Sequence, residues 1–299
     1  MEASLPTGVF AAALTPLRAD LDIDPAALAR HLLGLLEAGC DGLALFGTTG
    51  EATTFSIAER TAALEAVAAA GVPLHRLRVG TGACALPDAA ALTRHAVAAG
   101  AGGVLVLPPF YYKGVEDDGL FAFFDALIQR VGDARLRIYL YHFPKMSGVP
   151  ISAELAERLA RRYPSVLAGV KDSSGDLAHT GALIERLPGL RIFAGTERLL
   201  LDALRAGGAG CISATANVTA PHAAAVLRAW RRGRAEEAEA LQRHLSALRQ
   251  ALEAFPVIPA LKHRTGLGPV RPPLTSLPPE VTSALDAQLR ALAAAQEEG

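Results

Sequence analysis

Short apolar runs alternate with longer amphipathic stretches along most of this chain, and this alternation restricts the possible folds more than any other feature. The spacing is roughly 30 residues, the length of one strand–helix–strand unit. Eight apolar runs are bounded by turn residues and are short enough to be buried strands. We expect strands at Gly8–Leu14, Gly42–Phe46, Leu77–Gly80, Gly103–Leu107, Arg137–Tyr141, Val166–Val170, Arg191–Ala194 and Gly210–Ile212. Eight units predict an α/β fold, a closed (β/α)8 TIM barrel, because an open doubly wound sheet more often has fewer strands.

Between these runs, apolar residues recur at helical spacing. Asp24, Ser56 and Ser152 stand where N-caps are needed, and Glu59 completes a capping box with Ser56. Helices are therefore expected at Pro25–Ala38, Ser56–Ala70, Asp88–Ala99, Gly119–Val131, Ser152–Tyr163 and Leu199–Ala206.

After Ile212 the alternation stops, and the remaining chain is too long to be only the eighth helix of a barrel. Helical patterns continue at Pro221–Arg231, Ala235–Ala254 and Glu280–Gln296, with proline-punctuated segments between the last two. We expect residues 1–222 to form the barrel. Residues 223–299 should form a C-terminal helical extension that packs on the barrel within the same structural domain and offers a surface for oligomer contacts.

Charge and composition exclude several classes of function. The net charge of −1 gives no reason to expect nucleic acid or an anionic membrane as a partner. The N-terminus lacks a basic region followed by an apolar region, and no run approaches about 18 apolar residues, so neither a signal peptide nor a membrane span is expected. The three widely spaced cysteines are expected to be free thiols in a cytoplasmic protein.

The stretch V-L-A-G-V-K-D-S-S-G-D, from Val166 to Asp176, contains the most unusual residue of the chain. Its apolar run ends in Lys171, and a lysine that closes a buried strand is costly to desolvate. The cost falls if the amine is neutral, and a neutral amine is a nucleophile that condenses with a carbonyl. Alternatively, Lys171 extends to the rim of the barrel or pairs with Asp172.

Other candidates follow from the rule that a barrel places its active site at the C-terminal ends of its strands. Tyr141 ends the strand before Lys171, so the two should occupy corresponding positions on neighbouring strands, close enough for proton transfer. The loop Gly47–Glu51, G-T-T-G-E, can direct backbone N–H groups and threonine hydroxyls at a small anion such as a carboxylate. Alternatively, it is a tight turn capped by threonines. Metal-dependent aldol chemistry needs clustered histidines at strand ends, and only His142 is near one, so no metal site is predicted.

Taken together and in order, these motifs resemble the dihydrodipicolinate synthase / N-acetylneuraminate lyase family. The motifs are G-T-T-G-E, P-P-F-Y-Y, Y-H-F-P-K-M-S-G, G-V-K-D-S-S-G-D and I-S-A-T-A-N, and they lie between about Gly8 and Asn217, with a weaker similarity in Pro256–Pro273. The resemblance implies a (β/α)8 barrel with a helical C-terminal extension. It also implies homotetramers built as dimers of dimers, with no metal or organic cofactor beyond the covalent lysine–substrate imine.

The resemblance also implies roles for individual residues. Lys171 would form the Schiff base with pyruvate or another 2-oxo acid, and Tyr141 would carry protons. Thr48 would link Tyr141 to Tyr111, a second tyrosine that is commonly supplied across the dimer interface. The remaining residues implied to bind substrate are Gly47, Thr49, Met146, Ser173, Gly195, Glu197 and the carbonyl of Ile212.

One departure from the family pattern bears on the substrate. Dihydrodipicolinate synthases carry an arginine where this chain has Met146, and methionine cannot make the bidentate carboxylate contact of arginine. The leading prediction is therefore a Schiff-base aldolase or lyase acting on pyruvate or on a 2-oxo-3-deoxy or 4-hydroxy-2-oxo acid. A genuine synthase that condenses pyruvate with aspartate semialdehyde is the alternative, and a catalytically silent barrel with a binding or regulatory role is a third reading.

Overall fold

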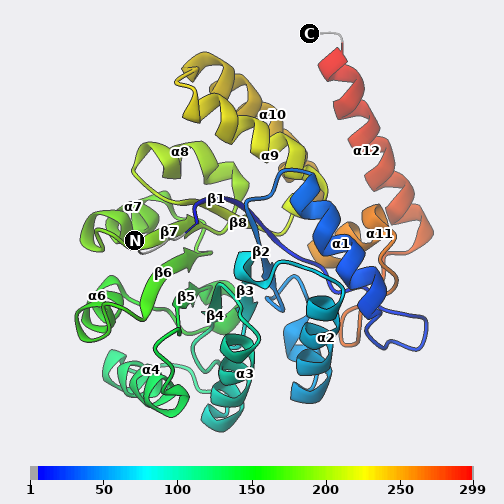
Figure 1. Cartoon of the computed structure of the whole chain (residues 1–299). Helices are drawn as coiled ribbons and strands as arrows, with labels where there is room; N and C mark the ends of the chain where they lie inside the picture. The colour runs from blue at the N-terminus through cyan, green and yellow to red at the C-terminus, as the bar shows by residue number, and fades with distance from the viewer. Residues whose placement is uncertain (1–5, 298–299) are drawn as a thin grey trace.

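Eight parallel strands close into a barrel in which each strand pairs with the next along the chain and β8 pairs with β1 (Figure 1). The structure, a computed structural model, describes residues 6–297. Residues 1–5 and 298–299 lie outside this range. The prediction that the N-terminus is not a signal peptide concerns these first five residues in part. The strands are β1 (Gly8–Ala12), β2 (Gly42–Leu45), β3 (Leu77–Gly80), β4 (Gly103–Val106), β5 (Ile138–His142), β6 (Leu167–Asp172), β7 (Arg191–Ala194) and β8 (Gly210–Ser213). The predicted (β/α)8 barrel is confirmed.

The strands begin and end within a few residues of the predicted bounds because nearly all of their side chains are buried. In such strands apolar and polar residues do not alternate, so the strands appear in the sequence as short continuous apolar runs. The one informative difference is β6, which extends through Lys171 to Asp172. Tyr141 is paired in register with Lys171, so the expected correspondence between neighbouring strands holds.

Helices surround the strands as an outer ring (Figure 1). Asp24 accepts a hydrogen bond from the Ala27 N–H, and Ser56 forms the predicted capping box with Glu59. The helices that connect successive strands are α1 (Pro25–Glu37), α2 (Ile57–Ala69), α3 (Leu86–Ala98), α4 (Asp117–Val131), α5 (Pro144–Ser147), α6 (Ala153–Arg162), α7 (Leu177–Arg186) and α8 (Leu200–Arg205). Three short 3-10 helices accompany them: η1 (Ala52–Thr54), η2 (Leu74–Arg76) and η3 (Glu197–Leu199).

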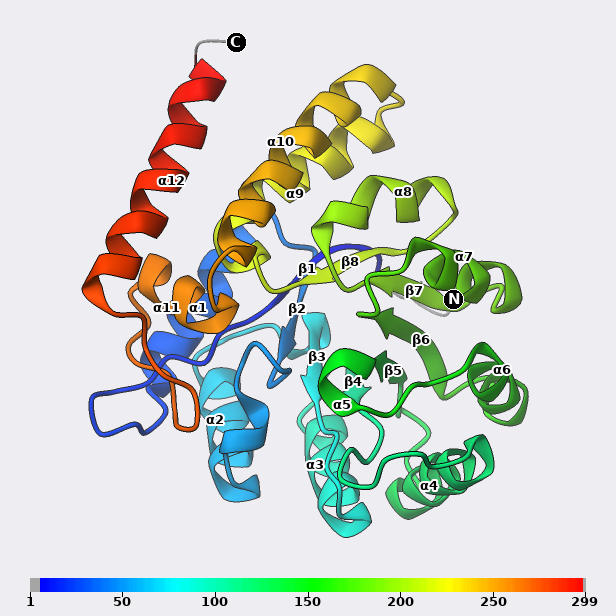
Figure 2. The same ribbon diagram turned by 180° about the vertical axis from the view of Figure 1, so that it is seen from behind.

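In the described part of the chain, four helices follow β8 and lie on the side of the barrel where β8 meets β1 (Figure 2). They are α9 (Ala216–Arg231), α10 (Ala235–Glu253), α11 (Val257–Thr265) and α12 (Pro279–Glu297). Because α9 packs on β1, it is the eighth barrel helix, and the boundary expected between residues 222 and 223 falls inside it. Helix α10 packs against α8, α9 and η3, so it covers the barrel wall beside the ends of β7 and β8.

The interior of the barrel is filled with side chains. Phe10, Tyr139 and Phe193 are fully buried, and their rings pack in edge-on or tilted pairs. The fully buried guanidinium of Arg78 lies 4.8 Å from the Tyr139 ring centroid and 5.4 Å from that of Phe10. Because these large groups occupy the interior, a ligand can enter only from the end where the strands terminate.

Candidate active site

A cavity of about 750 Å³ opens at the carboxyl ends of the strands. Side chains from the barrel strands and loops form one part of its wall, and the C-terminal helices form another. The polar lining residues are Thr48, Thr49, Tyr141, Lys145, Lys171, Ser173, Ser174, Thr196, Arg198, Arg249, Glu253 and Thr275. The volume lies within the range of about 300–1,000 Å³ that is typical of small-molecule sites.

Lys171 lies at the base of this cavity with only 3% of its surface exposed. Its Nζ is 4.2 Å from the ring centroid of Tyr141. Among residues 6–297, no carboxylate lies within ion-pair distance of this amine; the neighbouring Asp172 instead bonds His179 and Thr180. Lys171 therefore neither extends to solvent nor pairs with Asp172, and its amine faces the space that a ligand would fill.

Tyr141 connects the lysine to the G-T-T-G-E loop. Its hydroxyl is hydrogen-bonded to Thr48 Oγ1 at 3.2 Å. Thr48 and Thr49 both line the cavity, while Gly47 does not. The arrangement places the phenol of Tyr141, a group that can exchange protons, between the Lys171 amine and the Thr48 hydroxyl.

Two non-glycine residues in the left-handed region flank this loop. Phe46 and Glu51 both have φ of 56°, which costs an L-residue of order 1–3 kcal/mol and persists only where surrounding contacts hold it. Glu51 is held from the far end of the chain: its Oε1 lies 2.8 Å from Lys262 Nζ, and its Oε2 accepts the Arg271 N–H at 2.7 Å. The Lys262 contact is an ion pair without good hydrogen-bond alignment. The C-terminal extension thus fixes the conformation that presents Thr48 and Thr49.

Ser173 and Gly195 lie together where β6 and β7 end, and both line the cavity. The Ser173 N–H donates to the His142 carbonyl at 2.7 Å, and the Gly195 N–H donates to the Asp172 carbonyl at 2.6 Å. A Cβ on Gly195 would lie 2.2 Å from Ser173 Oγ, so only glycine lets the serine occupy this place.

Met146 and Tyr111 are both exposed, but only Met146 reaches the cavity. Met146, on α5, lines the mouth with 61% of its surface exposed. Tyr111 is 75% exposed and packs edge-on against Tyr112, outside the lining. Ile212 is fully buried within the barrel interior and contributes no side chain to the lining.

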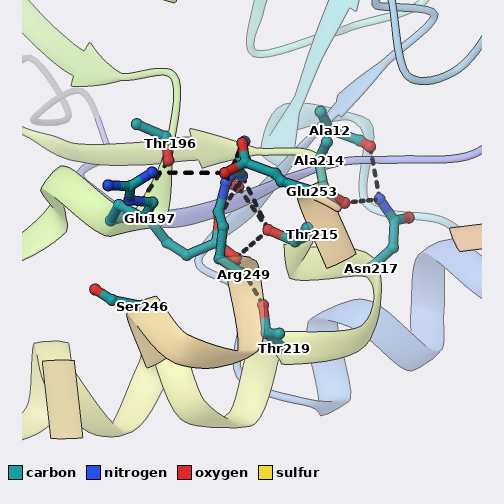
Figure 3. A network of polar contacts seen from close by, with 12 residues as sticks. Ala12, Thr196, Glu197, Ala214, Thr215, Asn217, Thr219, Ser246, Arg249 and Glu253 are labelled. Carbon is teal, nitrogen blue, oxygen red and sulfur yellow. Dashed lines mark hydrogen bonds and ion pairs between the residues drawn. The ribbon is translucent and has the colours of Figure 1, made fainter. Parts of the chain in front are cut away.

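The structure corrects the expectation that Glu197 binds substrate. Glu197 is fully buried outside the lining, and its Oε2 lies 2.9 Å from Arg249 Nη1 (Figure 3). Its Oε1 accepts hydrogen bonds from Thr215 and Thr219. Both carboxylate oxygens are therefore engaged by the protein, and Glu197 anchors α10 to the end of β8.

A second polar cluster, formed by Asp172, His142 and His179, lies on the other side of β6. Their potential ligand atoms lie within 4.8 Å of one another. His142 Nδ1 accepts the Ile151 N–H at 2.9 Å, and Asp172 Oδ2 bonds His179 Nδ1 at 3.0 Å and accepts from Thr180 Oγ1 at 2.6 Å. These bonds engage His142 Nδ1 and Asp172 Oδ2, and so the cluster acts as a hydrogen-bonded support for β6.

The profile of the Dihydrodipicolinate synthetase family matches residues 5–292, which is nearly the whole sequence. The chain belongs to the dihydrodipicolinate synthetase family. It is accordingly a lyase. The predicted reaction class, a Schiff-base aldolase or lyase, is confirmed by this family membership.

Individual relatives agree with this assignment. A protein of Chloroflexus aurantiacus named as an uncharacterized DapA-like lyase is 39% identical over 258 residues, which cover 86% of this chain and 85% of that protein. The structure of dihydrodipicolinate synthase from Agrobacterium tumefaciens has a TM-score of 0.87 at 36% identity, covering 96% of this chain and 99% of that chain. The structure of YagE, a prophage protein of E. coli K12 in complex with pyruvate, has a TM-score of 0.88 at 27% identity, covering 96% and 98%.

The sequence analysis did not predict the wall of the cavity that the C-terminal helices and η3 form. Arg249 and Glu253 come from α10, and Arg198 comes from η3. Further lining comes from residues 256–259 and 273–275. The available signals were the charged face of Ala235–Ala254 and the weak family similarity in Pro256–Pro273. Neither signal indicates that these segments return to the barrel mouth.

Proposed function

We propose that the chain is a Schiff-base aldolase acting on pyruvate or on a 2-oxo-3-deoxy or 4-hydroxy-2-oxo acid. The observation that carries the proposal is the position of Lys171, buried at the end of β6 with its Nζ 4.2 Å from the Tyr141 ring centroid. A buried lysine beside a hydroxyl proton carrier suits imine formation.

The reaction follows from these positions. The Lys171 amine attacks the keto carbon, and the carbinolamine loses water to give a protonated imine. In the cleavage direction, the C4 hydroxyl loses its proton, the C3–C4 bond breaks, and its electron pair enters the imine to form an enamine and an aldehyde. The enamine takes a proton at C3, and hydrolysis releases pyruvate from Lys171. Tyr141 carries the protons, and Thr48 and Thr49 hold the carboxylate.

The remaining sites enter the proposal in supporting roles. Ser173 and Gly195 flank the reacting carbons, and the Ile212 carbonyl and Gly47 complete the site with backbone atoms. We expect no metal or organic cofactor, so activity should survive exhaustive EDTA treatment.

Among residues 6–297, no helix is long and apolar enough to cross a membrane. We further propose a cytoplasmic homotetramer, a dimer of dimers that acts on a small-molecule 2-oxo acid.

A second candidate function is the condensation of pyruvate with aspartate semialdehyde. The relative from Agrobacterium tumefaciens is named as such a synthase, and Lys145 supplies a cation to the cavity here. Met146 argues against it, since it offers no fixed partner for the carboxylate of the aldehyde substrate. The third reading, a catalytically silent barrel, predicts that no imine forms.

Borohydride trapping tests the leading proposal. Pyruvate and borohydride should add one reduced adduct to Lys171, identified by mass spectrometry of peptides. Lys171→Ala should abolish the adduct, whereas Lys145→Ala, which removes the other lysine lining the cavity, should retain it. Tyr141→Phe should slow adduct formation by about 10²-fold, the usual scale for a positioned proton carrier. An adduct on another lysine, or none at all, contradicts the proposal.

A further inference from the structure

The cavity is much larger than the part of it that pyruvate requires. Lys171, Tyr141, Thr48 and Thr49 occupy one portion, and a three-carbon acid held by them leaves most of the 750 Å³ empty. The remaining polar wall is formed by residues of α10 and η3. In the reaction proposed above, this wall lies where the part of a substrate beyond its third carbon would be placed.

Arg249 is held rigidly in this wall. Its Nη1 lies within hydrogen-bond distance of Glu197 Oε2 at 2.9 Å and Thr215 Oγ1 at 2.9 Å (Figure 3). It also lies 2.6 Å from Ser213 Oγ. Only 9% of its side chain is exposed. Burial lowers the pKa of the Arg249 guanidinium, but the charges of Glu197 and Glu253 outweigh burial and raise it, so the group is a permanent cation.

Arg249 in turn fixes Glu253. Its Nε and Nη2 both donate to Glu253 Oε1, at 3.0 and 2.8 Å. Within the part of the chain that the structure describes, no hydrogen bond reaches Glu253 Oε2, which forms a longer ion pair with Arg198 Nη1 at 3.8 Å. One Nη2 hydrogen of Arg249 is also uncommitted. A fixed acceptor and a fixed donor therefore stand next to each other on the cavity wall.

The simpler explanation is an i,i+4 pair that stabilises α10. Such pairs lie on solvated helix faces, and each contributes a few tenths of a kcal/mol. Here the guanidinium is nine-tenths buried, tied to the ends of β7 and β8 through Glu197 and Ser213, and lines the same cavity as Lys171. Helix stability alone requires none of these features.

We propose that Arg249 and Glu253 form a specificity subsite for the hydroxylated tail of a 2-oxo acid. The proposal rests on the function proposed above and assigns the residues that select among its candidate substrates. A hydroxyl can donate to Glu253 Oε2 while a neighbouring hydroxyl accepts from Arg249 Nη2, so a pair of adjacent hydroxyls matches the two groups. A tail that ends in a carboxylate would instead meet the like charge of Glu253.

The concentration dependence of borohydride trapping at Lys171 tests this subsite. The probes are pyruvate, a six-carbon 2-oxo-3-deoxy acid with a hydroxylated tail, and 2-oxoglutarate, which carries a second carboxylate. For the unmodified protein, the hydroxylated acid should reach half-saturation at a concentration about tenfold or more below that of pyruvate, the factor that one charged hydrogen bond supplies.

Glu253→Gln is the variant that tests the role of the free carboxylate oxygen of Glu253. An amide oxygen can still accept from Arg249, but the free acceptor becomes an N–H donor. The half-saturating concentration of the hydroxylated acid should rise about tenfold, that of 2-oxoglutarate should fall, and that of pyruvate should change less than about twofold. Glu236→Gln, in the exposed first turn of the same helix, should change none of them.

The outcomes separate the two proposals. Equal half-saturation by pyruvate and the hydroxylated acid, or no selective effect of Glu253→Gln, overturns the subsite and leaves the Schiff-base chemistry standing. A loss shared by all three acids assigns Glu253 a structural role, which also overturns it. No adduct with any acid overturns the proposed function itself.

Discussion

Met146 is the single residue with the clearest consequence for the choice of substrate. It stands at the cavity mouth, 61% exposed, where relatives with synthase activity are expected to carry arginine. A contact between an arginine and a substrate carboxylate at a partly exposed position is worth about 2 kcal/mol, the lower end of the range for truncated charge pairs.

We predict that Met146→Arg raises kcat/KM for condensation of pyruvate with aspartate semialdehyde by roughly 30-fold, at about 1.4 kcal/mol per tenfold. Met146→Leu is the control and should leave the rate unchanged. Steady-state assays of condensation and of cleavage of hydroxylated 2-oxo acids provide the comparison. A wild-type synthase rate well above every cleavage rate would mean that Lys145 or another cation already replaces the arginine.

The hydrogen bond between Asp172 and His179 makes stability depend on pH. Burial raises the pKa of Asp172, but hydrogen bonds from His179, Thr180 and Ser174 outweigh it and hold the pKa below the usual 3.8. The same bond, opposed by burial, raises the pKa of His179 above its usual 6.5. The contribution of His179 is therefore complete below pH 6.5 and is lost as the pH rises through its folded-state pKa. That of Asp172 is present above pH 3.8 and is lost as the pH falls through its lower folded-state pKa.

We predict that His179→Gln lowers the free energy of unfolding most between about pH 4 and 6 and progressively less as the pH rises. Urea unfolding of both proteins across this range measures the difference. His142 complicates the absolute curve, because burial lowers its pKa and its charging opposes folding, but it remains in both proteins. A difference that grows from pH 6 to pH 9 would contradict the assignment.

At the scale of elements, the ion pair between Glu51 and Lys262 joins η1 to α11. Both side chains are almost fully buried, with exposures of 0% and 2%. Removing one partner of a buried pair leaves an uncompensated charge and costs about 3–5 kcal/mol, whereas replacing both is often nearly neutral.

Lys262→Met should accordingly destabilise the fold by about 3–5 kcal/mol, and Glu51→Gln combined with Lys262→Met should recover much of that loss. Arg234→Met, which breaks the exposed pair with Glu237, should cost less than about 1 kcal/mol. Urea unfolding of the four proteins measures these costs. Equal losses for Lys262→Met and Arg234→Met would show that the buried pair does not hold the Gly47–Glu51 loop.

At the scale of the whole molecule, the position of Tyr111 suggests that one subunit would supply this residue to the active site of its partner. Its ring is 75% exposed next to the equally exposed Tyr112, and it lies outside the cavity of its own chain. Two large exposed aromatic rings on one loop are typical of an interface, and in a two-fold dimer each subunit would supply the same residue to its partner.

Subunit mixing tests this arrangement. Tyr111→Phe should lower kcat by about 10²-fold, and Lys171→Ala should abolish activity. In a hybrid dimer the Lys171→Ala subunit can supply its Tyr111 to the intact lysine of its partner. Random assortment should then restore about a quarter of wild-type activity, since half of the dimers are hybrids with one working site. Mixtures no more active than Tyr111→Phe alone would exclude sharing across the interface.

Local sequence pattern was enough to predict the barrel and the neighbouring positions of Tyr141 and Lys171. Buried parallel strands are continuous apolar runs, and capping residues such as Ser56 act within a few positions, so local pattern specifies these elements. Tyr141 and Lys171 each end a predicted strand, one strand–helix unit apart. They were therefore expected side by side, because neighbouring parallel strands end at the same edge of the barrel. The family motifs lie in these same local segments, so they carried the enzyme class as well.

Which residues outside the strands reach the cavity depends on contacts between segments far apart in the sequence. Glu197 follows β7 and was expected to face the substrate, but Arg249, some fifty positions later, pairs with its buried carboxylate. Lys262 and Arg271 return to Glu51 across most of the chain. Such contacts depend on how α10 and α11 dock on the barrel, and that docking depends on packing between surfaces far apart in sequence. A periodic pattern records which face of α10 is buried, but the partner of that face appears only when the chain has folded.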